Sequence, residues 1–375
     1  MIVFFFPYEL NATDDRPSLK RPLKMLDALK KIAKTGQVLE LIGSSRDLKI
    51  KRIQPLIKND PVRAIEFVYV ESINKPLFLQ RIFERKINIF GDYCFFWQCK
   101  KHNIPLTMFY RDALWVSKQF RDLTPKYTYY FLKVVFYIEF KVFEYLFDVL
   151  FLPSIEMAKV LPLGENKVVI DELPPAVDLD KYQFVETNKP KKNQGIVLLY
   201  VGNINPGFYN ISPMVKVLEN DTSLKLNLCC RKQDWNLFKQ YYNFKYLKNV
   251  YVHHLVNDEL ERIYRQSDVH ILLFAEEEYR KFAVPFKFYE SLQFGIPIIT
   301  NKGTKVASLV REMDVGWVVN NQAEVSKLIV RLNSDMSLVQ KKKDNIARVI
   351  KANSWKARIE KVIKICTSSS YKISN

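Results

Sequence analysis

Residues 285–300 read PFKFYESLQFGIPIIT and carry the strongest indication of the fold. Lys287 and Glu290 are three residues apart, so both lie on one face of a predicted helix, which Gly295 ends before an apolar strand. In open parallel α/β sheets, ligands bind beyond the carboxyl ends of the strands. A carboxylate placed there can accept hydrogen bonds from two ribose hydroxyls, and an ammonium can neutralise phosphate. The alternative is an ordinary salt bridge on a helix surface.

The segments on either side continue the pattern. Residues 258–274, DELERIYRQSDVHILLF, predict an amphipathic helix, a Ser-Asp pair and an apolar strand, and residues 306–319, VASLVREMDVGWVV, predict a helix, a glycine and a strand. This order, with Pro-x-Lys-x-x-Glu and Gly-x-Pro between the two segments, resembles the donor-binding half of the GT-B glycosyltransferases, above all the family 4-like enzymes of the family 1/4 group. The resemblance covers most of residues 196–365 and, more faintly, residues 1–180.

Chain length and element order agree with that resemblance. At 375 residues the chain exceeds the size of most single cores, and strand and helix patterns alternate from MIVFFFPY onward, as in a parallel α/β sheet. The resemblance implies two Rossmann-like domains with parallel sheets facing across a cleft. We expect an acceptor-side domain at 1–182 and a nucleotide-sugar-binding domain at 195–352, joined by the polar linker 189–195. An amphipathic helix at about 353–375 should pack back on the first domain.

The formal charge of +18 lies mainly in the second half of the chain, partly in a basic cluster between Lys341 and Lys364. Such a charge favours an anionic partner, namely nucleic acid, anionic lipid or a diphosphate-bearing substrate. We expect no nucleic acid, because the sequence has no nucleic-acid-binding motif. The sequence has no run of about 18 uncharged apolar residues, and its opening predicts a first strand rather than a signal peptide.

The five cysteines have no paired metal-ligand spacing. We therefore expect reduced cysteines in a cytoplasmic protein, no metal site and no cofactor beyond the nucleotide-sugar substrate. The resemblance implies that the diphosphate leaving group is stabilised by cationic side chains, a task that does not require a divalent metal.

The resemblance also assigns the donor-binding residues. Lys287, with Arg231 or Lys232 after an apolar strand, should neutralise the diphosphate, and Glu290 should bind the ribose. The alternative for Arg231 is an ordinary exposed position. Three further positions are predicted to contact the donor through the backbone, at the turns after the strands at about 196–201 and 250–253: Gly202, His254 and Leu255.

One position departs from the family pattern. The first Glu of the Glu-x7-Glu motif corresponds to Phe282, whereas Glu290 matches the second. One of Glu276, Glu277 and Glu278 could replace the missing carboxylate, although three consecutive acids are also typical of a solvated loop. The stereochemistry of transfer, retaining or inverting, is therefore left open.

A polar pair follows the predicted strand PLTMFY in the first domain. Arg111 and Asp112 occupy the place where many relatives carry a His-Asp pair facing the donor sugar. We predict catalytic roles for both, with Asp112 orienting a sugar hydroxyl or acting as a base and Arg111 contacting phosphate or the acceptor. The alternative is an ion pair that holds the loop.

Aromatic and basic residues are interleaved in residues 115–133, a composition that suits the membrane interface, whereas 131–147 is interpreted mainly as a core helix. The sequence as a whole predicts a glycosyltransferase that moves a hexose or related sugar from a nucleotide-sugar donor to a glycan or lipid-linked glycan, in polysaccharide or glycoconjugate synthesis. It would be cytoplasmic, with peripheral binding to an anionic membrane surface. The alternatives are a non-catalytic relative that binds glycan or supports a partner enzyme and, last, a basic nucleic-acid-binding protein.

Overall fold

The structure is a computed structural model that describes residues 1–10, 17–33, 36–43, 65–79, 91–165, 168–182, 195–207, 209, 211–242, 244 and 248–368. The chain divides into two compact units. Unit 1 comprises Met1–Pro175 and Trp355–Asn375, and unit 2 comprises Ala176–Ser354. The predicted boundary in the linker 189–195 lies later in the chain than this division, and all of that linker except Gly195 falls outside the described residues.

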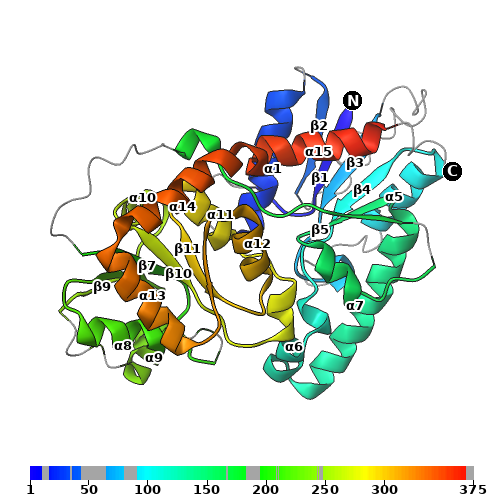
Figure 1. Cartoon of the computed structure of the whole chain (residues 1–375). Helices are drawn as coiled ribbons and strands as arrows, with labels where there is room; N and C mark the ends of the chain where they lie inside the picture. The colour runs from blue at the N-terminus through cyan, green and yellow to red at the C-terminus, as the bar shows by residue number, and fades with distance from the viewer. Residues whose placement is uncertain are drawn as a thin grey trace. The chain divides into compact units, whose positions relative to one another are not determined.

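Unit 1 contains a sheet of six described strands, all parallel, in the order β2-β1-β3-β4-β5-β6 (Figure 1). Its elements are β1 (Ile2–Phe6), α1 (Pro17–Ile32), β2 (Val38–Ile42), β3 (Phe67–Glu71), α5 (Gly91–Lys101), β4 (Leu106–Phe109), η1 (Leu114–Val116), α6 (Lys118–Leu123), α7 (Lys126–Leu146), β5 (Val149–Leu152), η2 (Ile155–Lys159), β6 (Val169–Glu172) and α15 (Trp355–Thr367). The strand order reverses at β1, so the topological switch point lies between β1 and β3.

Unit 2 contains a second parallel sheet of six described strands, in the order β12-β11-β10-β7-β8-β9. Its elements are η3 (Leu179–Lys181), β7 (Val197–Val201), α8 (Ser212–Asn220), β8 (Lys225–Cys229), α9 (Lys232–Phe238), η4 (Lys239–Tyr241), β9 (Val250–His253), α10 (Asn257–Arg265), β10 (Val269–Leu272), η6 (Glu278–Lys281), α11 (Phe286–Gln293), β11 (Ile298–Asn301), α12 (Lys305–Met313), β12 (Gly316–Val319), α13 (Gln322–Ser334), α14 (Met336–Val349) and η7 (Lys351–Asn353). The switch point here lies between β7 and β10.

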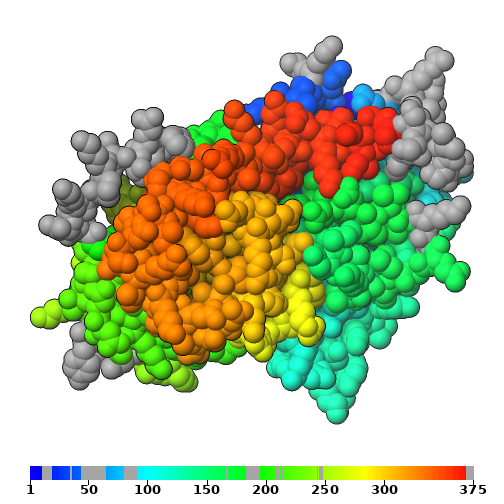
Figure 2. All heavy atoms as spheres, viewed as in Figure 1, coloured from blue at the N-terminus to red at the C-terminus, as the bar shows by residue number. Residues whose placement is uncertain are grey.

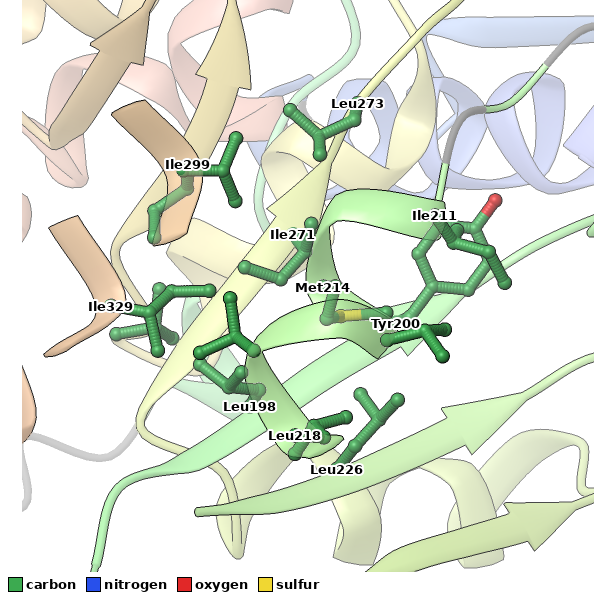
Figure 3. Close-up of a cluster of buried hydrophobic side chains, with 14 of the residues drawn as sticks. Leu198, Tyr200, Ile211, Met214, Leu218, Leu226, Ile271, Leu273, Ile299 and Ile329 are labelled. Carbon is green, nitrogen blue, oxygen red and sulfur yellow. The ribbon is translucent and has the colours of Figure 1, made fainter. Parts of the chain in front are cut away.

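The cores explain why strands such as β1, β5 and β7 are continuous apolar runs. Helices cover a parallel sheet on both faces, so side chains of both faces must be apolar. In unit 2, side chains of β7, β10 and β11 pack with those of α8 and α13, as Figure 3 shows. In unit 1 the apolar run IVFFF forms β1, where Phe5 stacks on Phe95 and meets Phe96 edge to face. Two parallel sheets in an α/β chain confirm the predicted fold class.

The last helix, α15, lies beside α1 in unit 1, although 179 residues of unit 2 separate it from Pro175 (Figure 1). Its apolar residues Trp355, Ile359 and Val362 are buried, as expected for the predicted amphipathic tail. The Arg358 guanidinium donates hydrogen bonds to the carbonyl groups of Pro174 (3.2 Å) and Pro175 (3.3 Å), which fixes the helix against the end of the first chain segment.

Candidate active site

The switch point of unit 2 brings together two of the predicted donor-binding residues. Gly202 directly follows β7 with φ of 156°, and its N–H donates to the Cys229 carbonyl at the end of β8 (2.9 Å). A Cβ atom on Gly202 would lie 3.5 Å from Cε of Lys287. The Lys287 side chain therefore lies close to the half-buried backbone of this turn, at the place where open α/β sheets bind ligands.

Helix α11 presents the predicted charged face away from its core. Phe288, Tyr289 and Leu292 are buried, whereas Lys287 and Glu290 are only half-buried. Within the described part of the chain, no ion pair joins Lys287 to Glu290, so the simple salt bridge is not what this spacing produces. Instead, the Tyr264 hydroxyl donates to Glu290 Oε2 (3.4 Å). Both charged groups are thus half-buried, and their chemistry suits a ligand with phosphate and hydroxyl groups.

A neutral histidine is linked to the backbone of Lys287 by hydrogen bonds through Ser291. The Ser291 hydroxyl donates to the Lys287 carbonyl (2.7 Å), and Nδ1 of His270 is hydrogen-bonded to the same hydroxyl oxygen. Because the Ser291 proton goes to the carbonyl, Nδ1 carries the proton in this pair. Burial, and then the Lys287 charge, lower the pKa of His270 to about 3. The imidazole is therefore neutral near pH 7 and adds no charge of its own.

The ends of β8 and β9 carry the other predicted donor-side residues. Nδ1 of His254 is hydrogen-bonded to the Cys230 carbonyl (2.8 Å), and the Leu255 carbonyl accepts from the Cys229 thiol (3.6 Å). Both residues thus lie at the same sheet edge as Gly202. Arg231 and Lys232 open α9 as exposed side chains. Their contribution to a phosphate site stays a prediction.

The loop before α11 contains Phe282, at the position of the motif's first Glu, and the three acids Glu276, Glu277 and Glu278. Phe282 is 3% exposed and packs edge to face on Tyr279, so its side chain is a core residue. Of the three acids in the loop, Glu276 and Glu278 are exposed, and Glu278 pairs with Lys281 (2.6 Å).

Glu277 differs from its two neighbours because it is half-buried. Its Oε2 lies 3.8 Å from Nε of Arg280, and burial raises the pKa of Glu277. The Arg280 guanidinium in turn lies over the rings of Tyr209 (5.2 Å) and Phe274 (4.7 Å). Among the three acids, Glu277 is therefore the one that is held in a partly buried position beside a cation.

The catalytic pair predicted for the first domain lies beyond β4 in unit 1. The Arg111 N–H donates to Ser72 Oγ (2.9 Å), and Asp112 Oδ1 accepts from the N–H of Leu114, the first residue of η1 (3.0 Å). Asp112 also lines a small, partly open hollow at the β1–β3 switch point.

Two residues of that hollow were not predicted from the sequence. Glu139 of α7 and Lys75 line it together with Asp112. Burial raises the pKa of Glu139 to about 7, since the hydrogen bonds it accepts offset desolvation only in part. Nothing in the sequence marks Glu139, because its partners come from residues 46 or more positions away.

Among the described residues, no group of three His, Cys, Asp or Glu side chains is arranged to hold a metal ion. The described helices include none that is long and apolar enough to span a membrane.

Residues 198–359 match the family model described as glucosyltransferase 3-like, C-terminal domain. The match covers most of unit 2 and the start of α15. No curated protein matches the sequence.

Solved GT-B structures resemble the whole chain. WaaG, a glycosyltransferase involved in lipopolysaccharide biosynthesis, has a TM-score of 0.59 at 11% identity, covering 98% of this chain and all of WaaG. Anabaena HepE in complex with UDP and glucose has a TM-score of 0.60 at 10% identity, covering 98% and 99%. The trehalose 6-phosphate synthase of Burkholderia multivorans has a TM-score of 0.58 at 10% identity, covering 100% and 99%. The GT-B fold predicted from the sequence is confirmed.

Proposed function

We propose that the protein is a glycosyltransferase that moves a sugar from a nucleotide-sugar donor to a glycan or lipid-linked glycan. The observation that carries this proposal is the contact of the Lys287 side chain with the glycine turn at the switch point of unit 2, inside the domain that matches a glycosyltransferase family. A HepE structure contains UDP-glucose. A nucleotide-sugar of that chemical class is therefore the first donor to test.

In the proposed mechanism, the Lys287 ammonium neutralises the diphosphate as the bond to the anomeric carbon breaks, with Arg231 or Lys232 as the second cation. Glu290 accepts hydrogen bonds from the ribose hydroxyls, while the backbone at Gly202, His254 and Leu255 contacts the nucleotide. Glu277 holds a hydroxyl of the transferred sugar. In unit 1, Asp112 orients or deprotonates the acceptor hydroxyl, and Arg111 contacts the acceptor or a phosphate. No metal is needed for these steps, so activity should survive a chelator.

The donor assignment predicts separate losses at Lys287 and Glu290. Lys287→Ala and Glu290→Ala should each weaken binding of a nucleoside diphosphate by about 1.5–3 kcal/mol, because a charge-assisted hydrogen bond is lost. Isothermal titration calorimetry with a panel of nucleoside diphosphates measures this. The matched control is Lys327→Ala, an exposed lysine of α13. Unchanged affinity of both site variants for every nucleotide that the wild type binds would contradict the assignment.

A non-catalytic relative is the second candidate, favoured by Phe282 at the motif's first Glu position. Assays of donor hydrolysis and of transfer to glycan acceptors distinguish the enzyme from the non-catalytic relative. Nucleotide binding without release of nucleoside diphosphate from any donor would favour the binding protein. Turnover that Glu277→Gln abolishes, while Glu278→Gln does not, would favour the enzyme and the proposed substitute.

A further inference from the structure

Helix α7 carries an apolar stripe on the face that it turns to solvent. Its inner face is buried through Tyr129, Phe136, Phe140 and Phe143. On the outer face Tyr127 is 90% exposed, and the other members are about half exposed. This outer stripe consists of Tyr127, Tyr130, Phe131, Val134, Tyr137, Ile138 and Tyr145. The interpretation of 131–147 as mainly a core helix therefore holds for one face only.

The stripe is continuous from Tyr127 to Ile138, and Tyr145 lies seven residues further along the helix. Its members recur every three or four residues over most of α7, the spacing that places them on one side. Atoms of α6 and α7 form part of the molecular surface in Figure 2 (teal). Single exposed apolar side chains are ordinary on a protein surface, but a run of seven along one helix marks an interaction surface.

The charges around the stripe have one predominant sign. Both carboxylates of α7, Glu139 and Glu144, are buried, and Glu144 is paired with Lys141 (2.8 Å). All residues of α7 are described, so its solvent face presents no carboxylate. On α6, the single acid Asp122 lies beside Arg121 (3.4 Å). The exposed cations of the two helices are Lys118, Arg121, Lys126 and Lys133.

The apolar stripe and the cations around it discriminate between two possible partners of this surface, a second copy of the chain and a lipid bilayer. A second copy of the chain docking through the same stripe would bring like charges of Lys126 and Lys133 together, which is unfavourable. An anionic lipid surface instead attracts the cations, while tyrosine and phenylalanine rings bury their apolar parts at headgroup depth. No described helix is long and apolar enough to span the bilayer, but exposed aromatic side chains flanked by lysines form a surface suited to the membrane interface.

We propose that the outer stripe of α7, flanked by the cations of α6 and α7, binds the surface of an anionic lipid bilayer. This inference rests on the proposed function only for the idea that the acceptor is lipid-linked. Lipid binding itself needs no donor, so it can be measured separately.

The test is cosedimentation of the full chain with phosphatidylcholine vesicles, with and without phosphatidylglycerol, over a salt series. The wild type should bind the anionic vesicles at low salt and dissociate as salt rises. Lys126→Ala/Lys133→Ala should weaken binding roughly 30-fold, because each cation near the surface contributes about a factor of five. Tyr130→Ser/Phe131→Ser should weaken it on the order of tenfold through lost apolar burial.

Two controls carry matched changes in unit 2: Lys327→Ala for charge and Tyr251→Ser for an exposed ring, and both should bind like the wild type. Equal binding to neutral and anionic vesicles, or equal loss in the controls, would overturn the proposal. So would a dimer found by sedimentation equilibrium without lipid and lost in Tyr130→Ser/Phe131→Ser, since that result assigns the stripe to a second copy. The same variants should bind nucleoside diphosphate like the wild type. If the wild type binds vesicles but no nucleotide, that result counts against the donor site alone.

Discussion

Glu139 shows how the fold changes the chemistry of a single residue. Its side chain accepts hydrogen bonds from the N–H groups of Leu77 (2.7 Å) and Phe78 (3.3 Å) and from the Tyr93 hydroxyl, yet burial dominates and raises its pKa from 4.5 to about 7. Because the folded state binds this proton more tightly than the unfolded state, the stability contributed by Glu139 is greatest below pH 4.5. It decreases as the pH rises toward 7.

We therefore expect Glu139→Gln to flatten this pH dependence. The amide oxygen can still accept a hydrogen bond but carries no charge, so the variant should gain up to about 3 kcal/mol relative to the wild type above pH 7. Below pH 4.5 the two should be similar. Urea unfolding at several pH values measures the difference, and Glu144→Gln provides a comparison at the other buried acid of α7. A constant difference between wild type and Glu139→Gln across this range would contradict the raised pKa.

Residues of the two candidate sites differ in how far the sequence revealed them. Lys287 and Glu290 were predictable because their spacing, a following glycine and a family pattern all lie within one short segment. His270 and Glu139 were not, since each is a single polar residue in an apolar run. Their environments are assembled from distant segments, Ser291 in one case and Leu77 in the other.

At the scale of elements, local sequence patterns predicted well where a helix ends. Helix α11 ends at Gln293, and Gly295 follows with φ of 68°, the left-handed conformation in which glycine costs little. The same signals could not reveal which face of α7 is covered. Periodicity shows apolar residues on both sides of that helix, and only packing distinguishes the inner from the outer face.

A buried ion pair connects α1 to the sheet of unit 1. Arg21 Nε donates to both carboxylate oxygens of Glu71 (3.1 and 3.2 Å), and the guanidinium also lies 3.4 Å from the ring centre of Phe109. The Tyr69 hydroxyl donates to the same carboxylate (2.6 Å). No local sequence pattern indicates this pair, because its partners are 50 residues apart on different elements.

Breaking one side of this pair should be costly. Arg21→Met leaves the Glu71 carboxylate buried without its cation and should lower the free energy of unfolding by about 3–5 kcal/mol. The double variant Arg21→Met/Glu71→Gln removes both charges and should recover part of that loss. Urea unfolding of the two single variants and the double variant gives the coupling energy. Strict additivity of the single losses would show that the pair contributes no interaction of its own.

For the whole chain, the sequence predicted two α/β domains and a helix that returns to the first of them. It did not predict the ion pairs that the basic cluster forms. The excess positive charge near the carboxyl end suggested a single basic surface. The structure instead pairs Lys342 with Asp314, Lys343 with Asp268 (3.8 Å) and Lys361 with Asp171 (2.8 Å). The first two pairs belong to unit 2 and the third to unit 1. Partners far away in sequence thus pair three cations of a cluster that is continuous only along the chain.

The assignment of α15 to unit 1 predicts that its removal affects the two units differently. Deleting residues 355–375 removes the buried side chains of Trp355, Ile359 and Val362 and exposes the apolar surface of α1 that they cover. Unit 1 should then unfold at a lower temperature, whereas unit 2 should still bind a nucleoside diphosphate with the affinity of the full chain. Scanning calorimetry with and without nucleotide identifies the transition of unit 2, because ligand binding raises its melting temperature.

Ile359→Ala should reproduce the effect more weakly, at about 2–5 kcal/mol, and the exposed Lys356→Ala should not. A truncated chain in which the nucleotide-stabilised transition falls instead would place α15 with unit 2 energetically and contradict this division of the chain.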